Sequence, residues 1–252
     1  MDSRPPSSQP TIFLIVGGAL VFGSFVLGAV ICLLIMINVT GWPAFLSKHD
    51  LKKPGMALKA RLPDDMRTTA QEAADDFKNR QFDEAASCYQ RIIDKYPECL
   101  YAWSNLGVVR FQQGHMDEAK SALLNAVSLS PEDAFSWANL GIVYYQLKDY
   151  SDATDALEKA VGLSPDEARS HNYLGCCYSQ TGDKTRATRE FETAIKLNDG
   201  FGDAYFNLAL NYATEKPPDL EKARSYYKKA RDLGIARDPR LEKIMGNSDA
   251  EK

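Results

Sequence analysis

The chain has 252 residues, of which 44% are hydrophobic and 25% are charged. These are the proportions of an ordinary folded protein of one or two domains. The whole chain carries a net charge of −4, but residues 1–61 carry +4, so residues 62–252 carry −8. Phosphate contacts need clustered lysine and arginine, so this acidic part gives no reason to expect a nucleic-acid partner. We expect neutral or basic partners instead.

The N-terminal part predicts a membrane anchor. Residues 1–10 read as a short polar tail, no charged residue lies between Arg4 and Lys48, and residues 12–37 are almost wholly apolar. About 20 apolar residues cross a bilayer as a helix. The apolar region of a cleaved signal peptide is shorter, usually ~7–15 residues. We therefore predict a retained transmembrane helix over residues 11–39.

Residues 40–65 read as a linker, because prolines interrupt them and no helical periodicity persists. Most of the positive charge near the anchor follows the predicted helix. The bias of such charge towards the cytoplasm favours a single-pass protein with its C-terminal domain on the cytoplasmic side. The alternative, a repeat domain on the periplasmic or lumenal side, is not excluded by the sequence. Within the anchor, Ser24, Gly28 and Cys32 lie four apart, a spacing that allows close helix contact and hence a homo-oligomer.

A 34-residue repeat organises the rest of the chain. From Trp103 the sequence reads Trp-Ser-Asn-Leu-Gly, and from Trp137 it reads Trp-Ala-Asn-Leu-Gly. Pro131 and Pro165 follow at matching distances, which gives a period of about 34, the length of a helix–turn–helix solenoid unit. The resulting frame predicts an array over residues 66–234 with units at 66–99, 100–133, 134–167, 168–201 and 202–235. Residues 236–252 should form a capping helix and a tail, and Pro217-Pro218 should delay the last unit's second helix by two residues.

The Trp-x-x-Leu-Gly-x-x-Tyr pattern and the alanines and prolines after it resemble the tetratricopeptide repeat (TPR) family, with a texture closer to its bacterial members. The resemblance implies an all-α TPR helix–turn–helix solenoid of about five repeats, preceded here by a single transmembrane helix. Gly107 and Ala119 are expected where paired helices cross, with larger residues such as Leu123 on either side. Gly114 and Gly182 are expected at the turns between helices.

The sequence offers no credible active site. His49, His115 and His171 fall in the linker, a turn and a core position, with no partner at metal-ligand spacing. Phosphate loops and nucleophile elbows are absent. Cys176 and Cys177 are expected to be buried as small hydrophobic residues rather than to act as thiols. We therefore expect no enzyme activity, no cofactor and no metal.

In the TPR family, the first helix of each unit lines a groove that holds a peptide. Asn105, Asn139 and Asn207 share one position of the repeat. They are similar to the asparagine ladder of the O-linked N-acetylglucosamine transferase repeats, whose side-chain amides bind a peptide backbone. Asparagine is also common there in the family, so both readings stay open. The resemblance implies these peptide-binding residues: Tyr101, Asn105, Val108 and Phe111; Phe135, Asn139, Ile142 and Tyr145; Asn172; Phe206 and Asn207. Arg169, Cys176 and Asp203 share the same helix faces.

Together these features predict a membrane-anchored TPR scaffold that binds extended peptide or helical segments of partner proteins, in the assembly of a membrane complex. The first unit has Ala70 and Ala74 where a carboxylate clamp needs lysine and asparagine, so acidic chaperone tails are not expected partners. The alternative is a self-assembling structural protein that oligomerises through the anchor and the repeat array.

Overall fold

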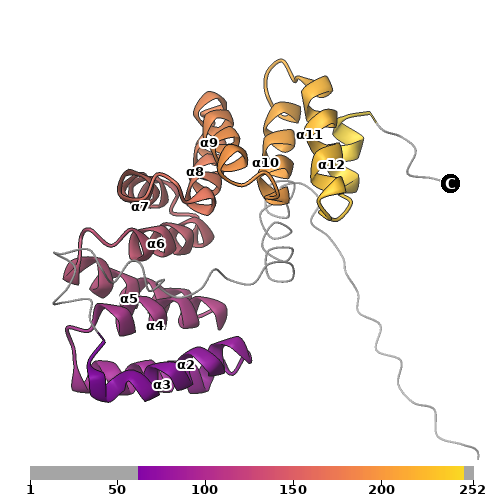
Figure 1. The fold of residues 1–252 in the computed structure, drawn as a ribbon. Helices are drawn as coiled ribbons and strands as arrows, with labels where there is room; N and C mark the ends of the chain where they lie inside the picture. Colours follow the sequence, from indigo (N-terminus) through magenta and orange to yellow (C-terminus); the bar gives the residue numbers. More distant parts are fainter. Residues whose placement is uncertain (1–61, 247–252) are drawn as a thin grey trace, which may run out of the picture. The chain divides into compact units, whose positions relative to one another are not determined.

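The computed structural model describes residues 62–246, and every regular element in that range is helical. The helices form pairs, and from α2 to α11 each helix packs against the next one along the chain (Figure 1). This confirms the predicted all-α helical-repeat solenoid. None of the helices in residues 62–246 is long and apolar enough to cross a membrane. The predicted transmembrane helix at residues 11–39 lies outside the described part of the chain.

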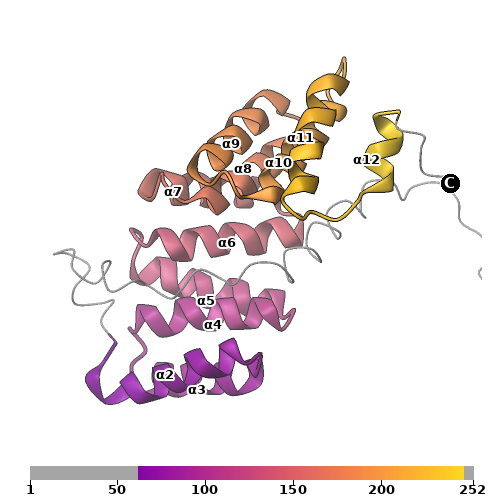
Figure 2. The ribbon, with the colours of Figure 1, turned by 45° about the vertical axis from the view of Figure 1, so that its right-hand side comes forward.

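The helix starts reproduce the 34-residue period, and Figure 2 shows the same succession of pairs from another side. The pairs are α2 (Arg67–Lys78) with α3 (Phe82–Lys95), α4 (Leu100–Gln112) with α5 (Met116–Leu129), α6 (Ala134–Leu147) with α7 (Tyr150–Leu163), α8 (Ala168–Thr181) with α9 (Lys184–Leu197), and α10 (Gly202–Ala213) with α11 (Leu220–Asp232). The short turn η2 (Asp64–Met66) precedes them, and α12 (Pro239–Ile244) follows. Helix α11 begins two residues later than the period requires, as expected from Pro217-Pro218.

The turn inside each of the first four units contains one residue in the left-handed conformation. Gly114 and Gly182, the two expected from the sequence, have φ of 81° and 91°. Arg80 and Lys148 occupy the same place in the other two units, with φ of 63° and 67°. Side chains with a Cβ adopt this conformation at a cost of roughly 1–2 kcal/mol. The repeat frame therefore imposes the turn geometry even where glycine is missing.

Glycine lets the two helices of a unit approach closely. A Cβ on Gly107 would lie 2.5 Å from Cγ of Leu123, and a Cβ on Gly141 would lie 2.5 Å from Cγ of Leu157. Carbon atoms in contact prefer about 3.5–4.0 Å. Ala119 is fully buried, and Leu123, which was expected beside the crossing, closes directly onto the glycine. A small residue therefore faces a large one across each crossing.

The repeated tryptophans tie each unit to the one before it. The indole N–H of Trp103 donates to the backbone carbonyl of Pro97 at 2.8 Å. Trp137 donates in the same way to Pro131 at 2.9 Å. Because the proline ends one unit and the tryptophan belongs to the next, this hydrogen bond fixes the junction between units. It explains why tryptophan and proline recur together in the sequence.

His171 takes the place of tryptophan in the fourth unit and keeps its hydrogen bond. Its Nε2 lies 3.0 Å from the carbonyl of Pro165, and its Nδ1 lies 2.6 Å from Oε2 of Glu190. Both ring nitrogens face acceptors, so the protonated imidazolium satisfies both contacts. The hydrogen bond to Glu190 is the main cause of the raised pKa of His171. The predicted core position is confirmed, with 9% of the residue exposed.

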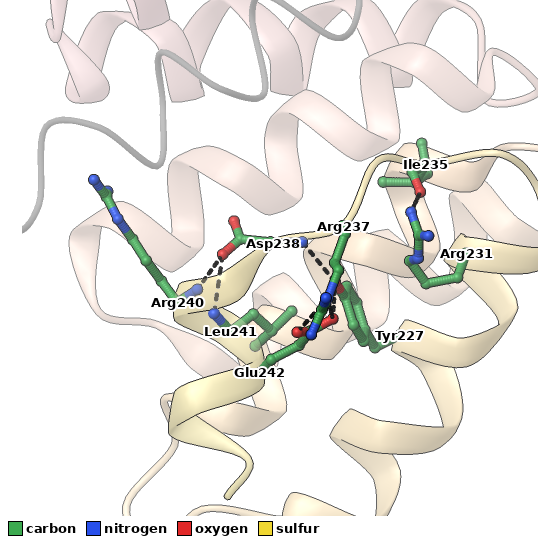
Figure 3. A network of polar contacts seen from close by, with 8 residues as sticks. All are labelled: Tyr227, Arg231, Ile235, Arg237, Asp238, Arg240, Leu241 and Glu242. Carbon is green, nitrogen blue, oxygen red and sulfur yellow. Dashed lines mark hydrogen bonds and ion pairs between the residues drawn. The ribbon is translucent and has the colours of Figure 1, made fainter. Parts of the chain in front are cut away.

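A polar network secures the C-terminal end of the array (Figure 3). The hydroxyl of Tyr227, on α11, donates to Glu242 at 3.2 Å and accepts the backbone N–H of Asp238 at 2.6 Å. Nε of Arg237 lies 2.9 and 2.7 Å from the two oxygens of Glu242. Helix α12 also contacts α10. The buried Glu242 carboxylate is thus paired and hydrogen-bonded, which makes its burial tolerable.

Candidate peptide-binding face

The first helices of successive units contact one another directly, α4 with α6, α6 with α8, and α8 with α10. We call the side formed by α2, α4, α6, α8 and α10 the first-helix face. The predicted binding residues all belong to these helices. The sequence does not show how deeply each side chain is buried. The burial seen in the structure separates the predicted residues into two groups.

The first group lies in the packing between helices. Val108 is 4% exposed, Ile142 is 2% exposed and Asn172 is fully buried. Phe206 is also buried, with its ring centroid 6.3 Å from that of Tyr227 on α11. These four side chains are packed inside the array and present almost no surface to a ligand. Their assignment as direct peptide contacts stays a prediction, and the burial of these side chains does not favour it.

The first two asparagines of the predicted ladder are bonded within their own helices. Nδ2 of Asn105 donates to the carbonyl of Tyr101 at 2.8 Å, and Nδ2 of Asn139 donates to that of Phe135 at 2.8 Å. Both are buried. Oδ1 of Asn139 also accepts from Arg169 at 3.2 Å. A peptide backbone would have to displace these bonds or use the second amide proton, so the ladder stays a prediction.

The third asparagine is bonded across a unit boundary. Nδ2 of Asn207 lies 3.0 Å from Oδ1 of Asn172 and 3.4 Å from Sγ of Cys176. Cys176 is half-buried, whereas it was expected to be buried, and Cys177 is buried as expected. Burial raises the pKa of Cys177 to about 12, so its thiol stays protonated. These two cysteines serve packing and polar contact in the structure.

The second group presents aromatic surface. Tyr101, Phe111, Phe135 and Tyr145 are all half-buried on the first-helix face. Phe111 and Tyr145 occupy the same position in consecutive units. Phe77 occupies that position in the first unit and is also half-buried. Sequence reasoning missed Phe77, although extending the 34-residue frame back from Phe111 would have found it. Three consecutive units therefore carry an aromatic ring at one position.

Neighbouring rings hold these aromatics in place. The rings of Tyr101 and Tyr89 meet edge to face with centroids 6.1 Å apart, and those of Tyr145 and Tyr173 do so at 5.8 Å. Such pairs add about 0.5–1.5 kcal/mol beyond the burial of area. Burial also raises the pKa of Tyr101 to about 12, so its hydroxyl is neutral at physiological pH. The aromatic surface is therefore uncharged and fixed in orientation.

The fourth unit changes the chemistry at this position. Ser179 stands where Phe111 and Tyr145 stand earlier, and its hydroxyl donates to Oδ1 of Asn211 at 3.1 Å. Nζ of Lys184 donates to Ser179 at 3.0 Å. Burial lowers the pKa of Lys184. This position on the first-helix face is thus aromatic in the first three units and polar in the fourth.

Within residues 62–246, histidine, cysteine, aspartate and glutamate side chains nowhere gather in a group of three or more that could hold a metal ion. The arrangement offers surface for contact and hydrogen bonding. Its helix pairs, their 34-residue period and their tryptophan–proline junctions define a tetratricopeptide repeat protein.

The chain belongs to the family described as the cilia and flagella-associated protein 70 C-terminal domain, whose model matches residues 33–198. Among curated proteins, no sequence matches. Solved structures share the fold. PilF of Pseudomonas aeruginosa aligns with a TM-score of 0.64 and 21% identity, covering 73% of this chain and 86% of its own. MamA aligns with a TM-score of 0.57 and 25% identity, covering 64% of this chain and 93% of its own.

A third structure, that of YrrB, is described as a TPR protein with an unusual peptide-binding site. It aligns with a TM-score of 0.58 and 22% identity, covering 72% of this chain and 92% of its own. At this identity the likeness concerns the fold. The TPR-like fold is typical of protein–protein interaction scaffolds, and that is the class to which the chain belongs.

Proposed function

We propose that this chain is a scaffold that binds an extended or helical apolar segment of a partner protein along its first-helix face. The observation that carries this proposal is the row of half-buried aromatics Phe77, Phe111 and Tyr145, one on each of three consecutive first helices. Partly exposed aromatics on a rigid support are the usual anchors of protein interfaces. Tyr101 and Phe135 add apolar surface on the same helices.

The proposal places this scaffold at a membrane. The uncharged apolar run within residues 11–39 supports a single anchor, and the lysine-rich residues after it support a cytoplasmic repeat array. A scaffold held at the bilayer meets partners that are themselves at the membrane. Assembly of a membrane complex is therefore the setting that we propose, without an enzymatic step.

The test compares two double variants of the full chain. Phe111→Ala with Tyr145→Ala removes two of the aromatic anchors. The matched control, Leu163→Ala with Leu197→Ala, removes two apolar side chains that are 43% and 40% exposed on second helices. Partners are crosslinked in intact membranes and quantified by mass spectrometry, and circular dichroism checks that each variant is folded.

The proposal expects at least one partner to be lost with the aromatic variant and kept with the leucine variant. Each anchor should contribute on the order of 1–2 kcal/mol, so the double variant should weaken binding by more than tenfold. Equal crosslinking of every partner by the two variants would show that the first-helix face does not bind them.

A further inference from the structure

We infer that the fifth unit makes the first-helix face selective for charge: Asp203 binds a lysine or arginine side chain of the partner segment whose apolar part contacts the aromatic rings. This inference rests on the proposed function and names the chemistry of the partner.

The position of Asp203 places it on the first-helix face. It is the second residue of α10 (Gly202–Ala213), and it occupies the place in its unit that Tyr101, Phe135 and Arg169 occupy in theirs. All four residues are half-buried. A segment that contacts Tyr101 and Phe135 and continues along the first helices therefore reaches Asp203.

The Asp203 carboxylate has no hydrogen bond or ion pair to any of residues 62–246. Other half-buried helix-start aspartates are bonded: Asp183 accepts the N–H groups of Arg186, and Asp219 those of Lys222. A carboxylate taken out of water without a partner is unfavourable. A cationic side chain from another protein would supply the missing partner.

Burial alone raises the pKa of Asp203 to about 6, which agrees with the absence of a nearby cation. The carboxylate is therefore still mostly ionised at pH 7. Its place in the first turn of α10 favours the ionised carboxylate, because the helix N-terminus stabilises negative charge. Asp203 thus presents an anion that accepts hydrogen bonds and cannot donate them.

The surrounding charge favours a basic partner residue and fixes where it lies. Residues 62–252 carry −8, which attracts a basic segment over a longer range. Arg169, one unit earlier at the same position, disfavours a second cation there and is bonded to Asn139. The lysine or arginine is therefore expected beside the fifth unit and not beside the fourth.

The experiment selects random 12-residue peptides displayed on phage against the full chain in detergent micelles, with Asp203→Asn in parallel. Asp152→Asn is the matched control, because Asp152 also lies in a first turn but is exposed on the second helix α7. We expect the wild type and the Asp152 variant to select peptides that combine aromatic residues with one lysine or arginine. The Asp203 variant should not enrich the basic residue.

Synthetic peptides then measure the pair itself. A selected peptide should bind the Asp203 variant at least about tenfold more weakly than the wild type, as expected when one partner of a close charge pair is removed. Replacing the peptide lysine by norleucine should abolish that difference in affinity. If Asp203 had only a structural role, the difference would remain. The Asp203 variant should melt no lower than the wild type, because it has lost a desolvated charge.

The outcomes separate the two proposals. If peptides bind through Phe111 and Tyr145 but carry no basic residue, or bind the Asp203 variant equally well, the inference is wrong and the proposed function stands. If no peptide is selected by any form, both fail. If light scattering shows that Asp203→Asn dissociates a dimer, a second copy of the chain occupies the first-helix face. If peptides are selected only after Lys52, Lys53 and Lys59 are replaced by glutamine, the chain's own linker occupies that face. Either result would overturn the proposal that Asp203 binds a separate partner protein.

Discussion

Replacing Gly107 by alanine tests how the helices of one unit are packed. The new Cβ would lie 2.5 Å from Cγ of Leu123 and 3.0 and 3.2 Å from its two methyl carbons. Leu123 is fully buried, so it has no open space into which to turn. Overpacking of this kind costs about 1–3 kcal/mol. Alanine recovers up to about 1 kcal/mol through its better helix propensity, which leaves a net loss of up to about 2 kcal/mol.

Gly162 provides the matched control. It lies in α7, and a Cβ there meets no atom within 4 Å. Gly162→Ala should therefore raise the free energy of unfolding by up to about 1 kcal/mol, since only propensity acts. Urea unfolding of the full chain in detergent, followed by circular dichroism and tryptophan fluorescence, should move the two midpoints in opposite directions. The fluorescence reports the affected region, because Trp103 lies in α4 with Gly107.

A double variant links the loss to the contact itself. Gly107→Ala combined with Leu123→Ala should cost less than the sum of the two single changes, because the short side chain no longer meets the new methyl group. If Gly107→Ala instead shifts the midpoint upwards, as Gly162→Ala does, the helices can separate without cost. The reasoning about the crossing would then be refuted.

Three further changes test the other contacts. The hydrogen bond to Glu190 raises the pKa of His171 in the folded state. The contribution of this pair to the free energy of unfolding should therefore be fully present below pH ~6.5 and be lost as pH rises through the folded pKa. His171→Trp should abolish this dependence in urea titrations at stepped pH, and an unchanged profile would contradict it. Glu242→Gln should lower the free energy of unfolding by about 1–3 kcal/mol in urea titrations, since the ion pair between Glu242 and Arg237 is lost. Lys148→Gly should raise it by about 1 kcal/mol by removing left-handed strain, and a lower urea midpoint would refute this.

The repeat frame could be predicted because a few residues determine both its period and its junctions. Trp103 and Trp137 each bond a proline carbonyl at the end of the preceding unit, so their spacing in the sequence equals their spacing in the structure. The turns were only half predicted. Glycine signals a left-handed residue, whereas Arg80 and Lys148 adopt that conformation with no sequence signal of their own, because the helices on both sides impose it.

The burial of the candidate binding residues could be predicted less well than the repeat frame, for a physical reason. The 34-residue frame gives the helix face on which a side chain lies, but its burial depends on how closely the next helix packs. Val108 and Ile142 are apolar residues on the expected face, yet they are only 4% and 2% exposed. Tyr101 and Phe135 are longer or lie nearer the helix start, and they keep exposed surface. The extent of an interface in a repeat protein therefore depends on contacts between units, which the pattern within one unit does not contain.

The same reasoning explains where selectivity arises in this array. The frame keeps the backbone positions equivalent, so units can differ only through the side chains placed on them. An aromatic ring at Phe77, Phe111 and Tyr145 gives way to Ser179 in the fourth unit, and the position of Tyr101 carries Asp203 in the fifth. A segment that follows the first-helix face would thus meet different side chains at equivalent positions of successive units. The chemistry that each unit presents can therefore change while the backbone of the array stays the same.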